Sequence, residues 1–504
     1  MRPGGREVGI ERRRDGRRVA DPAPRPDTIA GLRARSPRAA SDRTMSFQVS
    51  AREDLRRLLA IALPITLYQI GSMMLGVVDM LMVGHVGTDA VAAASLGILW
   101  VNGTWILGLG IVLGVDPLIS QAHGAQDGRG VAIAFQRGIV VAVLVSVPIG
   151  IAWAFAGPVL RALGQSADLA ASARYFVWAQ IPTLPFYMAT TAVQMYLVNR
   201  GRPIPIVIVV VVGNAINALL DWVLIYGHLG VPALGLTGSG IATGITRLVM
   251  FALLGGMVWG LRLHEGAWIP WGKHAFDVAG WKQIARIGMP TGITYFLEIW
   301  AFQIATLLAG RLGKMELAAH SIVLNMASLA FMIPMGIAAG AATRVGHLIG
   351  EGDSPRAQRT AHLALSVGAL AMGGSASLFA IFRHELPRLY GAEPAVAALA
   401  TTILPIAATF QLFDGTQGVG GGILRGMGRT RPAALFNLIG YYVLALPLAF
   451  VLAFRQHMGL TGLWWGLAMA LAMIATALVI FIVLRGPKTV ESRLEVASSA
   501  PASA

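Results

Sequence analysis

The sequence contains no cysteine, and only 13% of its 504 residues are charged. Without cysteine the chain forms no disulfide bond and no thiolate metal site. Soluble globular proteins carry about 25% charged residues, so the shortage of charge excludes soluble enzymes and nucleic-acid-binding proteins, although the formal net charge is +15. We therefore expect no nucleic-acid partner. Residues 1–45 also lack the apolar run of about 7–15 residues that a secretory signal peptide needs.

Long apolar segments are what the sequence has in abundance. Hydrophobic residues make up 55% of the chain, and the mean hydropathy is +0.65. Apolar runs of about 20 residues, each long enough to cross the hydrocarbon core as a helix, recur from Leu58 to Leu484. The sequence therefore predicts an all-α polytopic membrane protein with about 12 transmembrane helices. The predicted spans are 58–83, 92–120, 131–156, 175–198, 204–227, 236–261, 284–310, 318–346, 361–382, 396–424, 433–454 and 460–484.

The N-terminal segment is strongly basic. Residues 1–45 hold 12 arginines against 6 acidic residues, with scattered proline and glycine. This composition cannot build a packed core, so residues 1–50 are predicted to be a disordered basic extension. Two explanations stay open for it: an extension upstream of a start at Met45, or a segment that contacts anionic lipids. Residues 487–504 are predicted to be a C-terminal tail.

Lysine and arginine are unevenly distributed over the connecting segments. If both termini lie in the cytoplasm, the inner segments carry 20 of these residues and the outer segments carry 7. This asymmetry is the one that the positive-inside rule predicts, and the opposite orientation inverts it. We therefore expect both termini to be cytoplasmic.

The two halves of the chain repeat each other. A shift of 226 residues places Pro64 on Pro290 and Gly124 on Gly350, and we expect the paired prolines to act as hinges. An even number of spans separates the copies, so both copies share one orientation. This duplication favours a carrier rather than a channel, and in such a carrier two bundles rock so that the cavity opens to either side. The predicted parts are an N-lobe of six helices over 51–262, a cytoplasmic inter-lobe loop over 263–283, and a C-lobe of six helices over 284–486.

Acidic residues inside the C-lobe spans share a depth. Glu298 lies 12 residues from Arg286, roughly 18 Å along a helix, and Asp414 lies 11 residues before Arg425, roughly 16 Å along a helix that runs the other way. Both carboxylates are therefore expected near mid-membrane, where one bundle can bring them together. An acid in hydrocarbon is costly unless it faces a partner or water, so these two residues are candidates for function rather than for helix–helix hydrogen bonding alone.

The N-lobe spans hold a different set. Asp79 and Asp221 are expected in the outer half of the membrane, roughly 33 Å and 28 Å along their helices from the nearest inner arginines, and Asn217 lies one helical turn from Asp221 on the same face. The lobes thus differ in their acids although their backbones repeat, which favours a specialised role. Asp116, just before Pro117, and Arg247, within a span, have no assigned role.

At these residues the chain resembles the multidrug and toxic compound extrusion (MATE) transporters, over nearly all of 50–485. The resemblance rests on Pro64 with Val77-Val78-Asp79-Met-Leu-Met-Val-Gly84, Glu298 followed by Ala318-Ala319-His320 and Asn325, Phe331-Met-Ile-Pro334-Met with Arg344-Val-Gly-His347-Leu-Ile-Gly350-Glu351, and Asp414 followed by Gln417 and Leu424-Arg425-Gly426. Asp116 departs from the family pattern, which has an apolar residue there. Some relatives carry asparagine in place of Asp221, which leaves the coupling ion open between H⁺ and Na⁺.

The resemblance implies a cation-coupled antiporter of the bacterial inner membrane, not an enzyme, that exports lipophilic and often cationic organic compounds. It implies an N-lobe cation or proton site at Asp79, Asn217 and Asp221, and a C-lobe cation site, including Na⁺, at Glu298 and Asp414. No cofactor other than the coupling ion is implied, and we expect a monomer. The candidates for the substrate cavity are Tyr68, Gln69, Met73, Met74, Tyr295, Trp300 and Gln303, although ordinary helix packing is the more frequent role of such residues in membrane bundles.

Other functions are less consistent with the sequence. A membrane-embedded transferase needs closely spaced carboxylates for Mg²⁺, and the sequence has no such cluster; His384-Glu385 also lacks the second histidine of a metalloprotease motif. A flippase or exporter of a lipid-linked or other metabolite remains the alternative, because it can share the fold. Its cavity would have to be cationic to hold a diphosphate, whereas the charges within these spans are mainly acidic.

Overall fold

The computed structural model describes residues 51–490. All of these except Ala51 belong to one compact unit that begins at Arg52. The predicted extension over 1–50 and residues 491–504 of the predicted C-terminal tail lie outside the described residues. Within the described part of the chain the secondary structure is helical, without strands.

Eleven helices in the described range are long and apolar enough to cross a membrane, which confirms an all-α polytopic membrane protein. The N-lobe elements are α2 (Ala51–Gly84), α3 (Thr88–Val112), η2 (Leu113–Val115), α4 (Asp116–Gly124), α5 (Gly128–Ala154), α6 (Ala156–Ala162), α7 (Ala167–Trp178), η3 (Ile181–Thr183), α8 (Leu184–Asn199), α9 (Ile204–Tyr226) and α10 (Gly235–Gly260). The C-lobe elements are α11 (Val278–Leu312), α12 (Lys314–Gly350), α13 (Ser354–Ile381), α14 (Leu386–Leu389), α15 (Pro394–Gly426), α16 (Arg431–Asn437), η5 (Leu438–Ala445), α17 (Leu446–Phe450), η6 (Val451–Arg455) and α18 (Gly459–Arg485). Short turns η4 (Lys273–Phe276) and η7 (Pro487–Thr489) precede α11 and follow α18.

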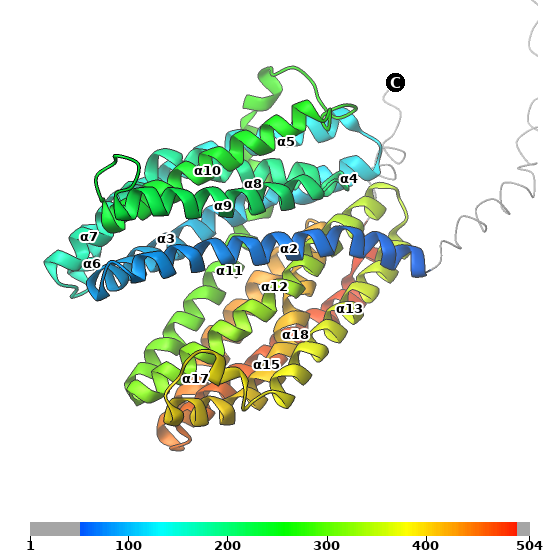
Figure 1. Cartoon of the computed structure of the whole chain (residues 1–504). Coiled ribbons are helices and arrows are strands. Elements are labelled where there is room, and N and C mark those ends of the chain that lie inside the picture. Colours follow the sequence, from blue (N-terminus) through cyan, green and yellow to red (C-terminus); the bar gives the residue numbers. More distant parts are fainter. Residues whose placement is uncertain (1–50, 491–504) are drawn as a thin grey trace, which may run out of the picture. The chain divides into compact units, whose positions relative to one another are not determined.

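The predicted span 175–198 is the exception, because it is not one continuous helix. The chain leaves α7 at Trp178, makes the 3₁₀ turn η3, and restarts as α8. Pro182 and Pro185 lie in the first turns of η3 and α8, where a proline fits because its missing N–H has no intrahelical acceptor. Helix α8 has 16 residues, about 24 Å, and α7 extends it toward α6 (Figure 1).

The internal repeat is visible in the helix boundaries. The segment α3–η2–α4 runs from Thr88 to Gly124 and α12 runs from Lys314 to Gly350, so both ends are shifted by 226 residues. The copies differ in continuity: α12 is one unbroken helix, whereas the first copy is interrupted by η2, directly before Asp116. This interruption places Asp116 at the beginning of α4.

Helix α2 packs against both lobes. Its Leu58 and Ala62 belong to the buried cluster formed by C-lobe helices, whereas Ile61 and Ile65 belong to the cluster formed by α4, α5, α8, α9 and α10. Residues four apart lie on the same face of a helix, so Leu58 with Ala62 and Ile61 with Ile65 form two neighbouring rows, and α2 contributes to both cores at once. The start of the N-lobe sequence is therefore also part of the C-lobe packing.

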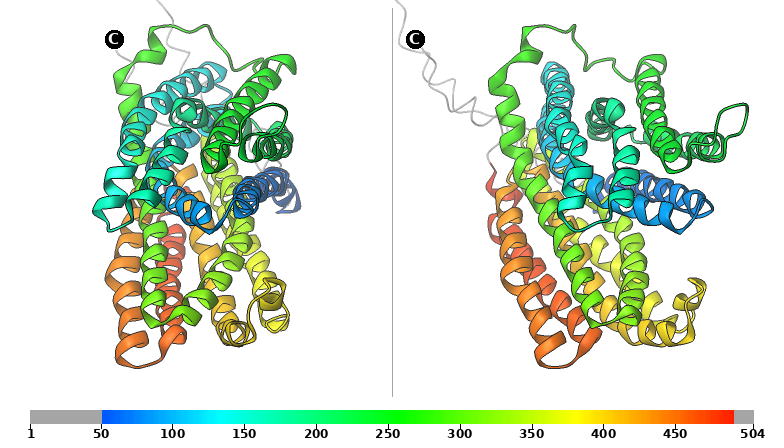
Figure 2. Two further views of the ribbon diagram at one scale, coloured as in Figure 1. Left: turned by 60° about the vertical axis from the view of Figure 1, so that its left-hand side comes forward. Right: turned by 90° about the vertical axis from the view of Figure 1, so that its left-hand side faces the viewer.

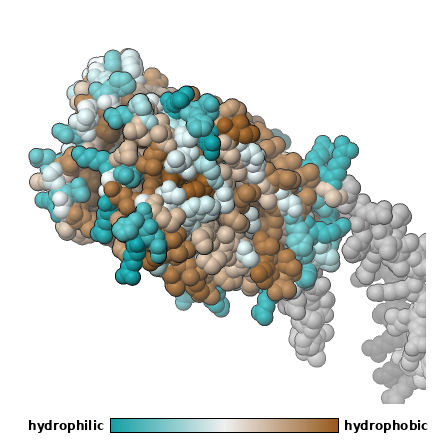
Figure 3. Space-filling view, turned by 90° about the horizontal axis from the view of Figure 1, so that it is seen from below, coloured by the Kyte–Doolittle hydropathy of each residue, from teal (hydrophilic) through white to brown (hydrophobic). Residues whose placement is uncertain are grey.

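Large apolar side chains cover the outside of both lobes, and Figure 3 shows one such face. Leu307, Leu370 and Leu484 are among the most exposed. Apolar side chains of this kind are stable in contact with lipid tails, which are as apolar as leucine. The surface is therefore suited to a bilayer rather than to water.

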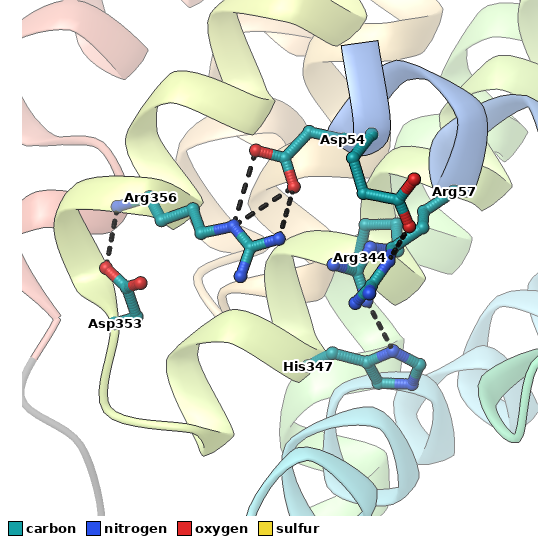
Figure 4. Close-up of polar contacts among 7 residues, drawn as sticks. Asp54, Arg57, Arg344, His347, Asp353 and Arg356 are labelled. Carbon is teal, nitrogen blue, oxygen red and sulfur yellow. Dashed lines mark hydrogen bonds and ion pairs between the residues drawn. The ribbon is translucent and has the colours of Figure 1, made fainter. Parts of the chain in front are cut away.

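The lobes meet at one end, which we call the closed end and define as the end where α4 contacts α12 and α15. Figure 1 shows α4 and α13 near this end, whereas α6 and α17 lie toward the opposite ends of their lobes. At the closed end Asp54 of α2 accepts a forked pair of hydrogen bonds from Arg356 of α13, with Nη2–Oδ1 at 2.7 Å (Figure 4). Both side chains are buried.

The connection between the lobes is anchored to the N-lobe. It runs over 261–277 and arches between α10 and α11 in Figure 2. Arg137 of α5 pairs with Asp277 at 2.7 Å, and Arg200 donates a hydrogen bond to the carbonyl of Glu265 at 2.7 Å. These contacts fix the position of the loop from which α11 begins.

Glycines allow the closest approach between the lobes. A Cβ atom added to Gly110 of α3 would lie 2.0 Å from Cα of Gly292 on α11, and one added to Gly124 of α4 would lie 2.0 Å from the carbonyl oxygen of His347 on α12. Small residues at helix contacts are how membrane helices gain packing energy, because lipid supplies no hydrophobic driving force.

We expect Gly110→Ala to separate α3 from α11 and to lower stability by about 1–3 kcal/mol, the usual range for overpacking. The measurement is thermal unfolding of the purified protein in detergent. Gly256→Ala is the matched control, because nothing lies within 4 Å of a Cβ at that exposed helical position. Equal unfolding temperatures for the two variants would contradict the proposed contact.

Candidate functional site

The first buried polar cluster lies within the N-lobe, between α2 and α9. Asp79 projects from α2, and Asn217 and Asp221 lie one turn apart on α9. The amide nitrogen of Asn217 donates hydrogen bonds to Oδ1 of Asp79 and, at 2.8 Å, to Oδ2 of Asp221. All three side chains are buried. The structure thus brings together the three residues that the sequence predicts for the N-lobe site.

The two carboxylates of this cluster also interact directly with each other. Two buried negative charges in contact repel strongly, so a proton or a cation between them stabilises the pair. Oδ1 of Asn217 and Oδ1 of Asp221 have no hydrogen-bond partner among the described residues. These two oxygens are therefore available to an ion.

Helix α10 completes the N-lobe cluster with residues that the sequence analysis did not assign. Thr243 donates a hydrogen bond to Oδ2 of Asp79 at 3.0 Å, and Ser239 lies beside Asp221. Arg247 is close enough for its charge to act on Asp79, and its Nη1 donates to Oε1 of Gln180 at 2.9 Å. The signal in the sequence is the i, i+4, i+8 spacing of these α10 residues, which places them on one face.

The second cluster lies within the C-lobe, between α11, α15 and η5. Glu298 of α11 accepts a hydrogen bond at 3.2 Å from Nε2 of Gln417, which lies one turn after Asp414 on α15. The charges of Glu298 and Asp414 interact, and Tyr441 is near both. The expected proximity of the two acids is therefore present in the structure.

Unpartnered oxygens mark this cluster too. Among the described residues, Oδ1 of Asp414 and Oε1 of Gln417 are buried without a hydrogen-bond partner. Carboxylate and amide oxygens are the ligands that hard cations prefer. The donor set of Glu298, Asp414 and Gln417 therefore fits a small cation such as Na⁺, and it fits a proton equally well.

A small, partly open pocket lies next to Glu298. Its lining combines one acid with aromatic, thioether and amide side chains: Tyr295, Glu298, Phe331, Met335, Gln417 and Arg425. Tyr295 is thus placed where the sequence predicts a substrate cavity. Arg425, which the sequence analysis assigned only to the resemblance motif, is the positive group in this lining.

The other predicted cavity residues do not line this pocket. Tyr68, Gln69 and Met73 lie on α2, and the hydroxyl of Tyr68 accepts a hydrogen bond at 2.7 Å from Gln194 of α8. Gln303 lies beyond Glu298 on α11. The predicted hinges Pro64 and Pro290 lie inside α2 and α11.

Asp116 is in a different place from both clusters. Its Oδ2 accepts a hydrogen bond at 2.7 Å from Nε of Arg425, and its Oδ1 accepts one at 2.6 Å from the amide of Asn199. Sequence patterns do not indicate these partners, because Asp116 and Arg425 are 309 positions apart and belong to different lobes.

We expect Thr243→Val to lower stability by about 1 kcal/mol, the usual net value of one hydrogen bond, because it removes the donor to Asp79. Thr246→Val on the same helix is the matched control, since the buried hydroxyl of Thr246 has no partner among the described residues. Thermal unfolding of both variants in detergent checks the difference. An unfolding temperature for Thr243→Val at or above that of Thr246→Val would contradict this assignment.

Comparison with known proteins places this arrangement in a family. The family model for MatE matches residues 64–223 and 290–451. The chain is 36% identical over 435 residues to the "Probable multidrug resistance protein NorM" of Bradyrhizobium diazoefficiens, which covers 84% of this chain and 91% of that protein. It is 31% identical over 461 residues to the mouse "Multidrug and toxin extrusion protein 2", covering 91% and 79% of the two chains.

A solved structure shows the same architecture. The crystal structure of a eukaryotic MATE transporter superposes with a TM-score of 0.80 at 25% sequence identity, covering 86% of this chain and 97% of that one. The matched regions include both lobes and the segments that carry Asp79, Asp221, Glu298 and Asp414. The chain belongs to the MatE family of multi-pass membrane transporters.

Proposed function

We propose that the protein is a cation-coupled multidrug efflux antiporter, in which H⁺, Na⁺ or both move inward while a lipophilic, often cationic organic compound moves outward. The relatives named multidrug resistance and multidrug and toxin extrusion proteins support this substrate class. The coupling ion is the only cofactor in this proposal, no covalent step is involved, and the working unit is a monomer.

The observation that carries the proposal is the presence of one buried carboxylate cluster in each lobe. Asp79 with Asp221, and Glu298 with Asp414, lie within helices that are otherwise apolar. Ionisable groups in such positions are costly and mark ion pathways. An ion changes a conformational equilibrium only by its difference in affinity between the two states, and a carboxylate that is buried in one state and hydrated in the other supplies such a difference.

Alternating access follows from the contact between the lobes. The closed end carries exposed basic residues, among them Arg129, Arg202, Arg359 and Lys488, so the positive-inside rule places it on the cytoplasmic side of the inner membrane. The coupling ion then enters from the opposite side.

The organic compound is proposed to bind beside Glu298, where aromatic and methionine side chains offer an adaptable apolar surface next to a negative charge.

The charges of the cavity argue against the alternative, a flippase or exporter of a lipid-linked metabolite. A diphosphate needs free cationic groups. Arg425, the arginine of the cavity lining, already pairs with Asp116 at 2.7 Å, so its charge is compensated, and Arg247 lies outside this lining. Glu298, in contrast, faces the cavity with a single donor, Gln417.

The C-lobe cluster is tested by Glu298→Gln and Asp414→Asn. We expect each to reduce the initial rate of ion-driven ethidium efflux from membrane vesicles by at least about tenfold, because the neutral side chain no longer exchanges an ion. Glu393→Gln, at an exposed position before α15, is the matched control. Membrane abundance of each variant is measured in parallel. Wild-type rates in both cluster variants would refute the assignment, whichever gradient drives transport.

The N-lobe cluster is tested by Asp221→Asn. Since two carboxylates in contact hold a shared proton and one carboxylate beside two amides does not, we expect the dependence of efflux on external pH between about 6 and 8 to flatten in this variant. Any dependence on Na⁺ should persist, because the C-lobe cluster is unchanged. Initial rates measured with separate pH and Na⁺ gradients give the answer; an unaltered pH profile would contradict an N-lobe proton site.

A further inference from the structure

Asp116 and Arg425 form a charge pair that joins the two lobes at the closed end. Asp116 begins α4 of the N-lobe and Arg425 lies in the last turn of α15 of the C-lobe. The pair is at 2.7 Å, and the two side chains are only 3% and 8% exposed. Arg425 lies at a helix C-terminus, where the helix dipole favours a cation.

The surroundings of the pair also come from both lobes. Asn199 of α8 donates to Asp116, and its own Oδ1 accepts a hydrogen bond at 3.0 Å from Thr343 of α12. The backbone carbonyl of Asn199 contacts Nε2 of His347 at 2.6 Å. Three contacts around Asp116 therefore join the two lobes: Asp116–Arg425, Asn199–Thr343 and Asn199–His347.

Close packing keeps water away from this network. A Cβ on Gly346 of α12 would lie 2.0 Å from Oγ of Ser120 on α4, and Nε2 of Gln121 donates at 3.1 Å to the carbonyl of Gly426, the residue after Arg425. Ser120 is fully buried. The charges thus compensate each other only as long as the lobes touch here.

We propose that Asp116 and Arg425 are positioning residues that hold the closed end shut, and that they separate and become hydrated each time this end opens. The inference rests on the alternating access of the proposed function. A buried pair with one member neutralised leaves the other charge uncompensated. In the opened state both groups reach water, so neutralising one of them destabilises the closed state selectively and shifts the population toward opening.

Arg425 also links this contact to the cavity. Its Nη1 donates at 3.0 Å to the hydroxyl of Tyr295, and both residues line the cavity that holds Glu298. One guanidinium therefore contacts the N-lobe carboxylate with Nε and the cavity wall with Nη1. When the closed end opens, Arg425 moves, and Arg425 is also part of the cavity wall. Opening of this end is thereby linked to the cavity beside Glu298.

The absence of cysteine makes the test direct. Ser120→Cys introduces one thiol between the lobes in an otherwise thiol-free chain. The measurement is the rate of modification of this thiol by a charged maleimide, with the purified full chain in lipid nanodiscs, where the reagent reaches both faces. The readout needs no ion gradient and no cargo, so it stays informative even if the proposed coupling is wrong.

In this background we expect Asp116→Asn and Arg425→Gln each to accelerate modification by about tenfold. The double variant should react no faster than either single variant, because the two changes remove one interaction. Asp127→Asn is the matched control: it lies at the same end, and its carboxylate caps α5 within the N-lobe. We expect it to change the rate by less than about twofold.

Two outcomes would overturn the proposal: unchanged modification in Asp116→Asn, or rates that multiply in the double variant to about a hundredfold.

If Asp116→Asn fails to reach the membrane, Thr343→Val replaces it, since this change removes only the hydroxyl that holds Asn199. We then expect modification several-fold faster than in the Ser120→Cys parent, and a rate equal to that of the parent would overturn the proposal.

Discussion

Compensation of buried charge is the constraint on which the functional parts of this protein depend. A carboxylate within a membrane helix is stable only with a partner, an ion or water. The chain meets this requirement differently at each place. Asp116 and Asp54 have arginine partners from the other lobe. Asp79, Asp221 and Glu298 have amide or hydroxyl partners, and Oδ1 of Asp414 has no hydrogen-bond partner among the described residues. The first kind of contact holds helices together, and the second kind leaves negative charge for an ion.

The internal repeat explains how both kinds coexist. Duplication of six helices gives two lobes with the same helix order, and the positions of the acids then differ between them. The interruption η2 shows that even the backbone is not copied fully, since α12 continues through the equivalent position. Asp116 lies directly after that interruption and contacts Arg425 of the other lobe.

Glycine and small polar residues decide where the lobes can touch. At Gly110, Gly292 and Gly346 a larger side chain would collide with the opposite lobe. The buried polar contacts of Asn199 and Thr343 lie in the same region. Dense packing combined with a few buried hydrogen bonds gives a contact that is tight when formed and that water can replace when the lobes separate. This combination suits the opening and closing that the proposed antiport requires.

Sequence patterns alone were enough to predict the helical membrane fold, the repeat and the relative positions of the acids along their helices. These properties follow from helix length, from apolar periodicity and from the rise of 1.5 Å per residue, which act along the chain. The sequence also indicated that Asn217 and Asp221 share a face, because they are four residues apart. The break between α7 and α8 escaped prediction, because Pro182 and Pro185 lie inside a run apolar enough to be taken for one span.

Which residues meet across helices depends on tertiary packing. Thr243 contacts Asp79 over a separation of 164 residues, and Gln417 contacts Glu298 over 119. Arg425 divides its hydrogen bonds between Asp116 and Tyr295. Such contacts depend on the rotation of each helix about its axis and on the crossing of the lobes, and many residue pairs of equal depth satisfy the same sequence pattern. Depth along a helix is a local property, whereas the choice of partner is set by how all the helices pack.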